Sequence, residues 1–324
     1  MAPPPHVEGT SLLGYAADEP LQVGILLCTY NGGQYLREQL ESFITQTYTH
    51  WRLYVSDDGS TDQTKAILSH YAERLGERMV VFEGPRQGFA QNFMSLIRNA
   101  HVRCHAYAFS DQDDIWLGDK LQRSVEVLRR TPADQPALYC SRTRLIDTRG
   151  KTIGFTPVFK KQPSFRNALV QSLAGANTMM INESARALLS LTTNDDPVVA
   201  HDWLTYLVVS GCGGAVTYDP IPTLLYRQHE GNLIGANTGL GSRVNRLVKM
   251  LEGRFKTWNE KNLRVMERYY PVMTLESRQL LTQFKQLRGK GLRTRMAALQ
   301  KAGFYRQTLA GTLSLHVAVI LKQV

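Results

Sequence analysis

The sequence predicts an α/β protein with a doubly wound, mostly parallel sheet, followed by a basic helical C-terminal region. Short apolar runs alternate four times with helical patterns at the spacing of βαβ units, and polar clusters follow three of these runs. A change of charge marks the second part. Residues 1–239 carry 21 basic and 24 acidic side chains, whereas residues 240–324 carry 17 basic and four acidic ones.

The first half of the chain contains the repeated strands and helices. Residues 23–28 form a continuous apolar run, which is typical of a strand buried on both faces of a parallel sheet. Apolar residues at helical spacing follow at Leu36, Leu40, Phe43 and Ile44. Further strands are expected at residues 51–56, 79–82 and 106–109, a capping box at Ser60 and Gln63, a helix at residues 89–100, and a helix capped by Asp119.

The second half has a mixed pattern. Short strands are expected near residues 137–140, 178–181 and 224–227, and a helix near residues 200–209. From Ser242 the pattern is helical and basic, with apolar residues Leu247, Leu251, Phe255 and Trp258, a break at Gly289 and Gly291, and a last helix through Met296, Leu299, Phe304 and Leu309. We therefore expect a loose leader over residues 1–20, a main domain over 21–240 and a C-terminal region over 241–324.

Composition excludes several classes of protein. Residues 1–239, with a net charge of −3, would repel a nucleic acid, so we expect no nucleic-acid partner. The four cysteines are widely spaced and no basic segment precedes an apolar run near residue 1, which indicates free thiols in the cytoplasm and no secretory signal. The longest mostly apolar stretch, residues 309–321, is shorter than the ~20 residues that span a bilayer.

Three polar clusters follow predicted strands, at residues 29–31, 57–58 and 111–114. Ligands of open α/β sheets bind at the carboxyl ends of the strands, where these clusters would meet. Asp111, Asp113 and Asp114 offer hard oxygen ligands suited to Mg²⁺ or Mn²⁺, which would be shared with a diphosphate. Each cluster alone is also consistent with solvated loop residues.

An ordered set of motifs resembles family 2 glycosyltransferases, particularly the rhamnosyltransferase-like branch. The resemblance covers roughly residues 21–235 and rests on residues 29–31, 56–62, Gly88 with Asn92, 110–116, 201–203 and 226–229. It implies the Rossmann-like glycosyltransferase A fold, with a nucleotide-binding half at about 21–135 and an acceptor half at about 136–240. It also implies transfer of a sugar, with inversion, from a nucleotide diphosphate donor to an acceptor hydroxyl.

The same resemblance implies roles for individual residues. Thr29 and Asp58 would contact the nucleoside, with Asp58 reading a pyrimidine edge, and Asp113 would be the principal metal ligand. Asp202 would be the general base, and His229 would approach the metal or the diphosphate. The remaining donor-site residues would be Tyr30, Asn31, Asp57, Asn92, Asp111 (also supporting the metal), Asp114 and Arg227, and residues 175–177 would lie near the acceptor.

Several of these residues have structural alternatives. Asp202 would also serve as the N-cap of a helix, although an inverting transfer needs only one such carboxylate as its base. Arg227 would bind diphosphate or close a salt bridge, and His229 would be a ligand or an ordinary packed histidine. Many relatives carry Glu-Asp where this chain has His201-Asp202, so the part played by His201 is open.

The C-terminal region also has two interpretations. Its basic residues with interleaved aromatic ones suit the surface of an anionic membrane, which would make the protein peripheral on the inner face of the cell membrane. Alternatively, its apolar stripe packs on the main domain. We expect a glycosyltransferase that uses dTDP-rhamnose or a similar donor, with a glycan or lipid-linked glycan acceptor in cell-surface polysaccharide synthesis.

Three other functions are alternatives to this one. One is a transferase of the same fold with another hexose donor, and another is a non-catalytic membrane-associated adaptor. A nicotinamide-dependent oxidoreductase would share the sheet, but the first strand lacks the Gly-x-Gly-x-x-Gly turn that cradles a dinucleotide.

Overall fold

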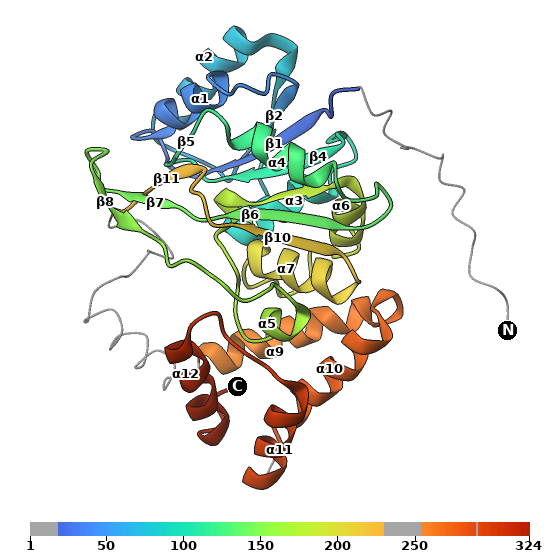
Figure 1. Cartoon of the computed structure of the whole chain (residues 1–324). Coiled ribbons are helices and arrows are strands. Elements are labelled where there is room, and N and C mark those ends of the chain that lie inside the picture. The colour runs from blue at the N-terminus through green and yellow to red at the C-terminus, as the bar shows by residue number, and fades with distance from the viewer. Residues whose placement is uncertain (1–18, 230–253, 290) are drawn as a thin grey trace, which may run out of the picture.

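A central sheet of seven strands organises the protein (Figure 1). The computed structural model describes residues 19–229, 254–289 and 291–324. The strands lie in the order β10-β6-β9-β4-β1-β2-β3, and all neighbours are parallel except β9, which is antiparallel to β4 and β6. They are β1 (Val23–Thr29), β2 (Trp51–Asp57), β3 (Met79–Glu83), β4 (Ala106–Ser110), β6 (Ala137–Ser141), β9 (Met180–Asn182) and β10 (Ala215–Asp219). The predicted doubly wound, mostly parallel sheet is confirmed.

Helices cover both faces of this sheet. The helices of the main domain are α1 (Leu36–Ile44), α2 (Thr64–Leu75), α3 (Phe89–Arg98), α4 (Lys120–Leu128), α5 (Phe165–Ala168), α6 (Glu183–Leu189) and α7 (His201–Gly211), with short 3₁₀ turns at Gly76–Arg78 and Ala176–Thr178. All seven residues of β1 are buried, because β2 and β4 flank it and helices pack on both of its faces. The apolar run that predicted β1 is therefore explained by the burial of the strand on both faces of the sheet.

The predicted capping box at the start of α2 is wrong. The capping residue is Gln63, and its side chain makes no capping hydrogen bond. The Ser60 hydroxyl oxygen instead accepts from the Asn31 N–H at 2.9 Å, and the hydroxyl donates to Asp57 Oδ1 at 2.5 Å. Asp119 does occupy the N-cap position of α4, but it too makes no side-chain capping bond.

A smaller sheet, which the sequence analysis predicted only in part, stands beside the first (Figure 1). Its order is β5-β11-β7-β8, from strands β5 (Ile115–Trp116), β7 (Arg144–Ile146), β8 (Thr152–Phe155) and β11 (Leu224–Arg227). The predicted strand at residues 224–227 is confirmed as β11. Strand β11 pairs with β5 directly after the aspartates of residues 111–114, so this sheet brings residues 227–229 to those aspartates.

The C-terminal helices form a layer beneath α5 and α7 (Figure 1). They are α9 (Arg254–Tyr269), α10 (Leu275–Gln286), α11 (Leu292–Ala302) and α12 (Leu309–Ile320), with a 3₁₀ turn at Tyr270–Val272. The predicted break near Gly289 and Gly291 is confirmed. The predicted last helix is wrong in extent, because Gly303, with a φ of 64°, ends α11 and separates it from α12. The expected leader up to residue 18 and the helical pattern at Leu247 and Leu251 lie outside the described residues.

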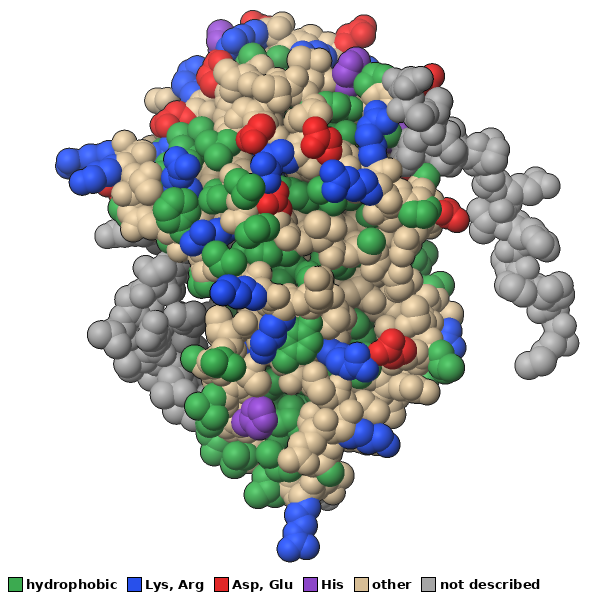
Figure 2. Space-filling model, viewed as in Figure 1, with side chains coloured by type: hydrophobic (Ala, Val, Ile, Leu, Met, Phe, Trp, Pro, Cys, Tyr) green, Lys and Arg blue, Asp and Glu red, His purple; other side chains and the backbone are tan. Residues whose placement is uncertain are grey.

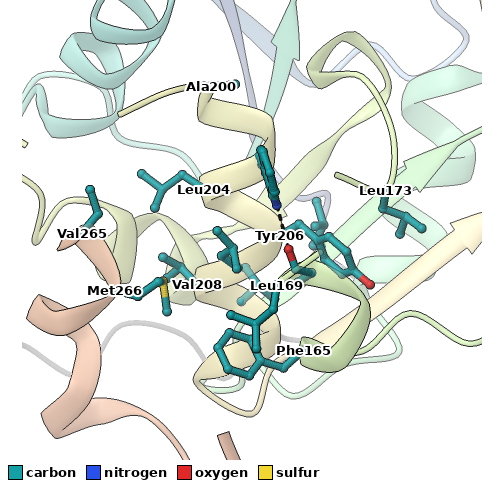
Figure 3. Packing of buried hydrophobic residues seen from close by; sticks show 14 of the residues in the cluster. Phe165, Leu169, Leu173, Ala200, Leu204, Tyr206, Val208, Val265 and Met266 are labelled. Atoms are coloured by element: carbon teal, nitrogen blue, oxygen red, sulfur yellow. Dashed lines mark hydrogen bonds between the residues drawn. The ribbon is translucent and has the colours of Figure 1, made fainter. Parts of the chain in front are cut away.

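One continuous apolar core joins these helices to the main domain (Figure 3). Leu204 and Val208 of α7 lie between Leu169, which follows α5, and Met266 of α9. All four residues are almost completely buried. The packing alternative for the C-terminal region therefore holds for α9. Within the described residues, no helix has the length and apolar character needed to cross a bilayer.

Because this core is shared, we expect Met266→Ala to lower the stability of the whole protein. Removing most of a side chain with no exposed surface costs roughly 2–5 kcal/mol. Thermal unfolding followed by circular dichroism should show a lower midpoint in a single transition. The control is Leu275→Ala, since the Leu275 side chain is 72% exposed. A Met266→Ala midpoint equal to that of wild type would contradict the shared core.

Candidate functional site

The three polar clusters meet at the carboxyl edge of the central sheet. Strands β4, β1 and β2 are neighbours, and their register places Thr29 beside Asp57. The Thr29 hydroxyl donates to Asp57 Oδ1 at 2.9 Å, and the Asp58 backbone N–H donates to the Thr29 carbonyl at 2.8 Å. The clusters that follow β1, β2 and β4 are thus parts of one surface, as the topology of a parallel sheet predicts.

Hydrogen bonds fix the loop after β1 against the loop after β2. Asn31 has a φ of 48°, its backbone N–H donates to Ser60 Oγ at 2.9 Å, and its Oδ1 accepts from the Thr61 N–H at 2.9 Å. Asp57 accepts from both the N–H and the hydroxyl of Ser60. The side chains of Asn31 and Asp57 therefore shape this edge, and the Tyr30 ring, 59% exposed, remains open to solvent.

Asp58 and Asn92 hold the next loop. The Asp58 carboxylate accepts from the backbone N–H groups of Arg86, at 2.6 Å, and Gly88, at 2.9 Å. Asn92 of α3 donates to the Ser56 carbonyl at 3.0 Å and accepts from the Ser56 hydroxyl at 2.5 Å. The Asn92 side chain is thereby bound to both the backbone and the hydroxyl of Ser56 in β2. Asp58 retains acceptor capacity, because a carboxylate can accept about four hydrogen bonds.

Gln112 makes a contact between the loops after β4 and β1 that the sequence did not predict. Its side-chain amide pairs with the backbone of Tyr30: the Tyr30 N–H donates to Oε1 at 2.9 Å, and Nε2 donates to the Tyr30 carbonyl at 3.0 Å. A Cβ at Gly32 would lie 2.2 Å from Gln112 Oε1, so this close approach requires glycine there. Gly32 was the one feature of the sequence that could have indicated a close contact here, although a glycine does not reveal which residue approaches it.

Asp113 and His229 form the central pair of the site. His229 Nε2 lies 2.7 Å from Asp113 Oδ2, although 116 residues separate the two in the chain. Both side chains are about one-fifth exposed, so they face accessible space rather than the core. Two of the three residues expected as metal ligands, Asp113 and His229, thus lie in contact.

Negative charge gathers around this pair. Burial first, and then the charges of Asp113 and Asp202, raise the pKa of Asp111 to about 7. Burial likewise raises the pKa of the Cys28 thiol, with further contributions from Asp111 and Asp58. Asp111 therefore interacts electrostatically with Asp113 of its own loop and with Asp202 of α7, so Asp202 belongs to the same region as Asp111.

Asp202 lies in the first turn of α7. Ala200, not Asp202, occupies the N-cap position, and the Asp202 carboxylate accepts from the Trp203 N–H at 2.7 Å. The Trp203 indole is buried and donates to the Ala168 carbonyl at 2.7 Å, which fixes the start of the helix. Burial raises the pKa of Asp202 to about 6, against the lowering effect of its hydrogen bonds. Asp202 is a carboxylate of raised basicity that is not needed as a cap.

These donors fit a divalent cation only if a ligand completes its shell. Within the residues that the structure describes, no group of three or more His, Cys, Asp or Glu side chains is arranged to hold a metal ion. Mg²⁺ is usually bound through one or two carboxylates together with substrate phosphates and water. Asp113 with His229 supplies two protein donors, and the mutual repulsion of the aspartates favours a cation beside them.

Asp114 and Arg227 are buried scaffold residues. Asp114 has no exposed surface and accepts from Asn177 Nδ2 at 2.6 Å and from the Arg227 N–H at 3.1 Å. The Arg227 guanidinium donates to the Asp113 carbonyl at 3.0 Å and to Glu38 Oε2 at 2.8 Å. Of the two alternatives for Arg227, the structure has the salt bridge. Neither side chain presents surface to a donor in this structure, and Asn177 packs on Asp114.

Comparison with known proteins follows the same residues. A model described as Glycosyl transferase family 2 matches residues 24–189. The chain belongs to glycosyl transferase family 2. It is 29% identical over 232 residues to the dTDP-rhamnosyl transferase RfbG of Shigella flexneri, which covers 68% of this chain and 78% of that protein. It is 34% identical over 107 residues to the putative teichuronic acid biosynthesis glycosyltransferase TuaG of Bacillus subtilis (strain 168), covering 33% of this chain and 41% of that one.

Solved structures agree on the fold of this glycosyltransferase. The structure of S. aureus TarS residues 1–349 in complex with UDP-GlcNAc superposes with a TM-score of 0.54 at 15% identity, over 93% of this chain and 90% of that one. GalNAc-T7 with UDP, GalNAc and Mn²⁺ gives 0.54 at 13% identity, over 92% and 58%. At such identities the likeness is one of fold. The expected Rossmann-like glycosyltransferase A fold is confirmed, and C-terminal helices accompany it.

His201 is an apolar packing residue in this glycosyltransferase. Its ring stacks on Phe93 with centroids 3.8 Å apart and meets Phe109 edge-on at 5.2 Å. The ring is 3% exposed, and neither nitrogen has a hydrogen-bond partner. Burial lowers the pKa of His201 to about 3, so the ring is neutral at physiological pH. Nothing in this geometry directs His201 to the aspartates.

We therefore expect His201→Phe to keep glycosyl transfer within about twofold of wild type. Removing two unpaired buried nitrogens should raise the free energy of unfolding by about 1 kcal/mol. Urea unfolding and a transfer assay would measure the two effects. His201→Leu controls for the larger volume of phenylalanine. Loss of transfer in both variants, with folding intact, would show that a ring nitrogen takes part in the reaction.

Proposed function

We propose that this family 2 enzyme transfers rhamnose, with inversion, from dTDP-rhamnose or a similar nucleotide diphosphate sugar to the hydroxyl of a glycan or lipid-linked glycan. The observation that carries the proposal is the grouping of Asp113, His229, Asp111 and Asp202 at the carboxyl edge of the sheet. The choice of rhamnose rests on the similarity to a protein named as a dTDP-rhamnosyl transferase.

In this proposal one part of the site binds the nucleoside of the donor and another part binds its diphosphate. The exposed Tyr30 ring and the free acceptor capacity of Asp58 would bind the nucleoside, and Thr29 and Asn31 would hold their loops in place. Asp113 and His229, with Asp111 in support, would hold Mg²⁺ or Mn²⁺ against the diphosphate. The cation would supply positive charge that stabilises the leaving diphosphate.

Asp202 would act as the general base. Its carboxylate takes the proton of the acceptor hydroxyl, the hydroxyl oxygen forms a bond to the anomeric carbon, and the bond from that carbon to the diphosphate breaks. The nucleotide diphosphate leaves with the bonding electrons. A raised pKa makes Asp202 a stronger base than an ordinary aspartate, while it remains mostly ionised at pH 7.

The first test is binding and turnover with a panel of nucleotide sugars. We expect dTDP-rhamnose to bind in the presence of Mg²⁺ or Mn²⁺ and to release dTDP when an acceptor is supplied. Calorimetry would measure binding, and nucleotide release would measure turnover. Asp113→Ala should abolish the dependence of donor binding on the cation. Turnover with another hexose donor would refute the choice of rhamnose, and cation-dependent binding by Asp113→Ala would refute the metal assignment.

The second test separates the base from the donor site. Asp202→Asn should bind the donor as wild type does, because Asp202 would touch only the acceptor, and should lower the transfer rate about 10²–10⁴-fold. Since only the ionised carboxylate accepts a proton, the wild-type rate should fall as pH drops below about 6 and level off above that value. Steady-state rates at saturating cation would show this limb. Wild-type transfer by Asp202→Asn would rule out the assignment.

A further inference from the structure

Helix α12 exposes an apolar stripe on the side away from its packed face. Leu315, Ala318 and Val319 are buried in the core that α12 shares with the other helices. Leu309 is 85% exposed and Leu313 is 67% exposed, and further along the helix Val317, Ile320 and Leu321 are also exposed. Leu309, Leu313, Val317 and the C-cap Leu321 are four residues apart, and Ile320 is three residues after Val317, so these five side chains lie on one face.

Such a stripe is unusual on the surface of a folded protein. A surface helix normally carries charged or polar residues opposite its packed face, whereas α12 contains no charged residue at all. Contiguous exposed apolar surface marks a site of contact with another protein or with a membrane. The stripe covers about 18 Å along the axis, at 1.5 Å per residue, so it would lie in the plane of a membrane rather than cross it.

The surroundings of the stripe are positively charged. Residues 277–324 contain nine Lys and Arg and no Asp or Glu. Arg293 and Lys301 of the neighbouring helix α11 are exposed, as is Lys322, which follows α12. Apolar and basic side chains are seen together over the C-terminal helices in Figure 2.

Nearby carboxylates offset only part of this charge. The last three acidic residues of the chain are each paired with a cation: Glu260 with Arg288, Glu267 with Lys285 at 3.0 Å, and Glu276 with Arg166 at 2.9 Å. A second copy of the chain docked on this face would bring two basic surfaces together. An anionic lipid surface instead complements both the charge and the apolar stripe.

We propose that the α12 stripe, formed by Leu309, Leu313, Val317, Ile320 and Leu321, inserts into the interfacial region of an anionic phospholipid bilayer. Arg293, Lys301 and Lys322 lie near the headgroups and add an electrostatic attraction. Helix α9 anchors this region to the main domain, so the catalytic domain is held at the membrane surface. The inference does not depend on the donor, the metal or the base.

Vesicle flotation of the full chain tests this surface. We expect the protein to float with vesicles of phosphatidylcholine and phosphatidylglycerol, less with phosphatidylcholine alone, and less again as salt is raised. The variant Leu309→Ser/Leu313→Ser should reduce partitioning roughly tenfold or more, because it removes two inserted leucines. Both side chains are exposed, so its thermal midpoint should match wild type.

Two controls make the result specific. Leu191→Ser/Ile221→Ser removes two exposed apolar side chains from the main domain and should float as wild type does. Asp202→Asn should also float normally, which separates membrane contact from transfer. Protein that stays unbound with anionic vesicles at low salt would overturn the proposal. So would equal flotation of the Leu309→Ser/Leu313→Ser variant, or a self-association that this variant abolishes.

Discussion

The contact between the Asp113 carboxylate and the His229 imidazole is the constraint on which the site depends. The two side chains come from loops of different sheets, and they meet only because β11 pairs with β5 directly after the aspartates. Arg227 also holds the aspartate loop in place, since its guanidinium donates to the Asp113 carbonyl and its backbone N–H donates to the Asp114 carboxylate. A displacement of β11 would therefore move the histidine and the aspartate loop together.

Burial divides the aspartates of this loop into different chemical roles. Asp114 has no exposed surface and is held by Asn177 and Arg227, so its carboxylate serves the position of the loop. Burial and the nearby charges of Asp113 and Asp202 raise the pKa of Asp111, so a positive charge at that point would stabilise its ionised form. A run of neighbouring aspartates thus supplies one buried anchor and two partly exposed carboxylates, and the sequence motif alone does not distinguish them.

The sequence predicted those features that local patterning controls. Strand β11 and helix α1 begin and end where the apolar pattern placed them, and the polar clusters after β1, β2 and β4 lie together because parallel topology requires it. The failures share a physical cause, which is competition between partners that are distant in sequence or chemically equivalent. Ser60 would cap a helix in isolation by accepting from a backbone N–H of the first turn, but its hydroxyl oxygen accepts from the distant Asn31 N–H instead.

Arg227 illustrates the same limit for the site itself. An arginine at the end of a β-strand, two residues before a histidine, suggests phosphate binding. The buried Arg227 guanidinium instead donates to Glu38 of α1, which is 189 residues away and about half exposed. The hydrogen bond between Gln112 and the Tyr30 backbone was indicated in the sequence only by Gly32, which has no side chain. Pairings of this kind depend on tertiary proximity, which composition and periodicity do not encode.

The two interpretations of the C-terminal region are compatible because different helices satisfy them. Helix α9 is amphipathic, and its apolar residues Val265 and Met266 are buried in the core beneath α7. Helix α12 is apolar around most of its circumference, so packing one face leaves the other without a partner. Folding against the main domain therefore does not use all the apolar surface of the region. The surplus is concentrated on a helix within residues 277–324, which contain nine Lys and Arg and no Asp or Glu, so an anionic surface there would lower the free energy most.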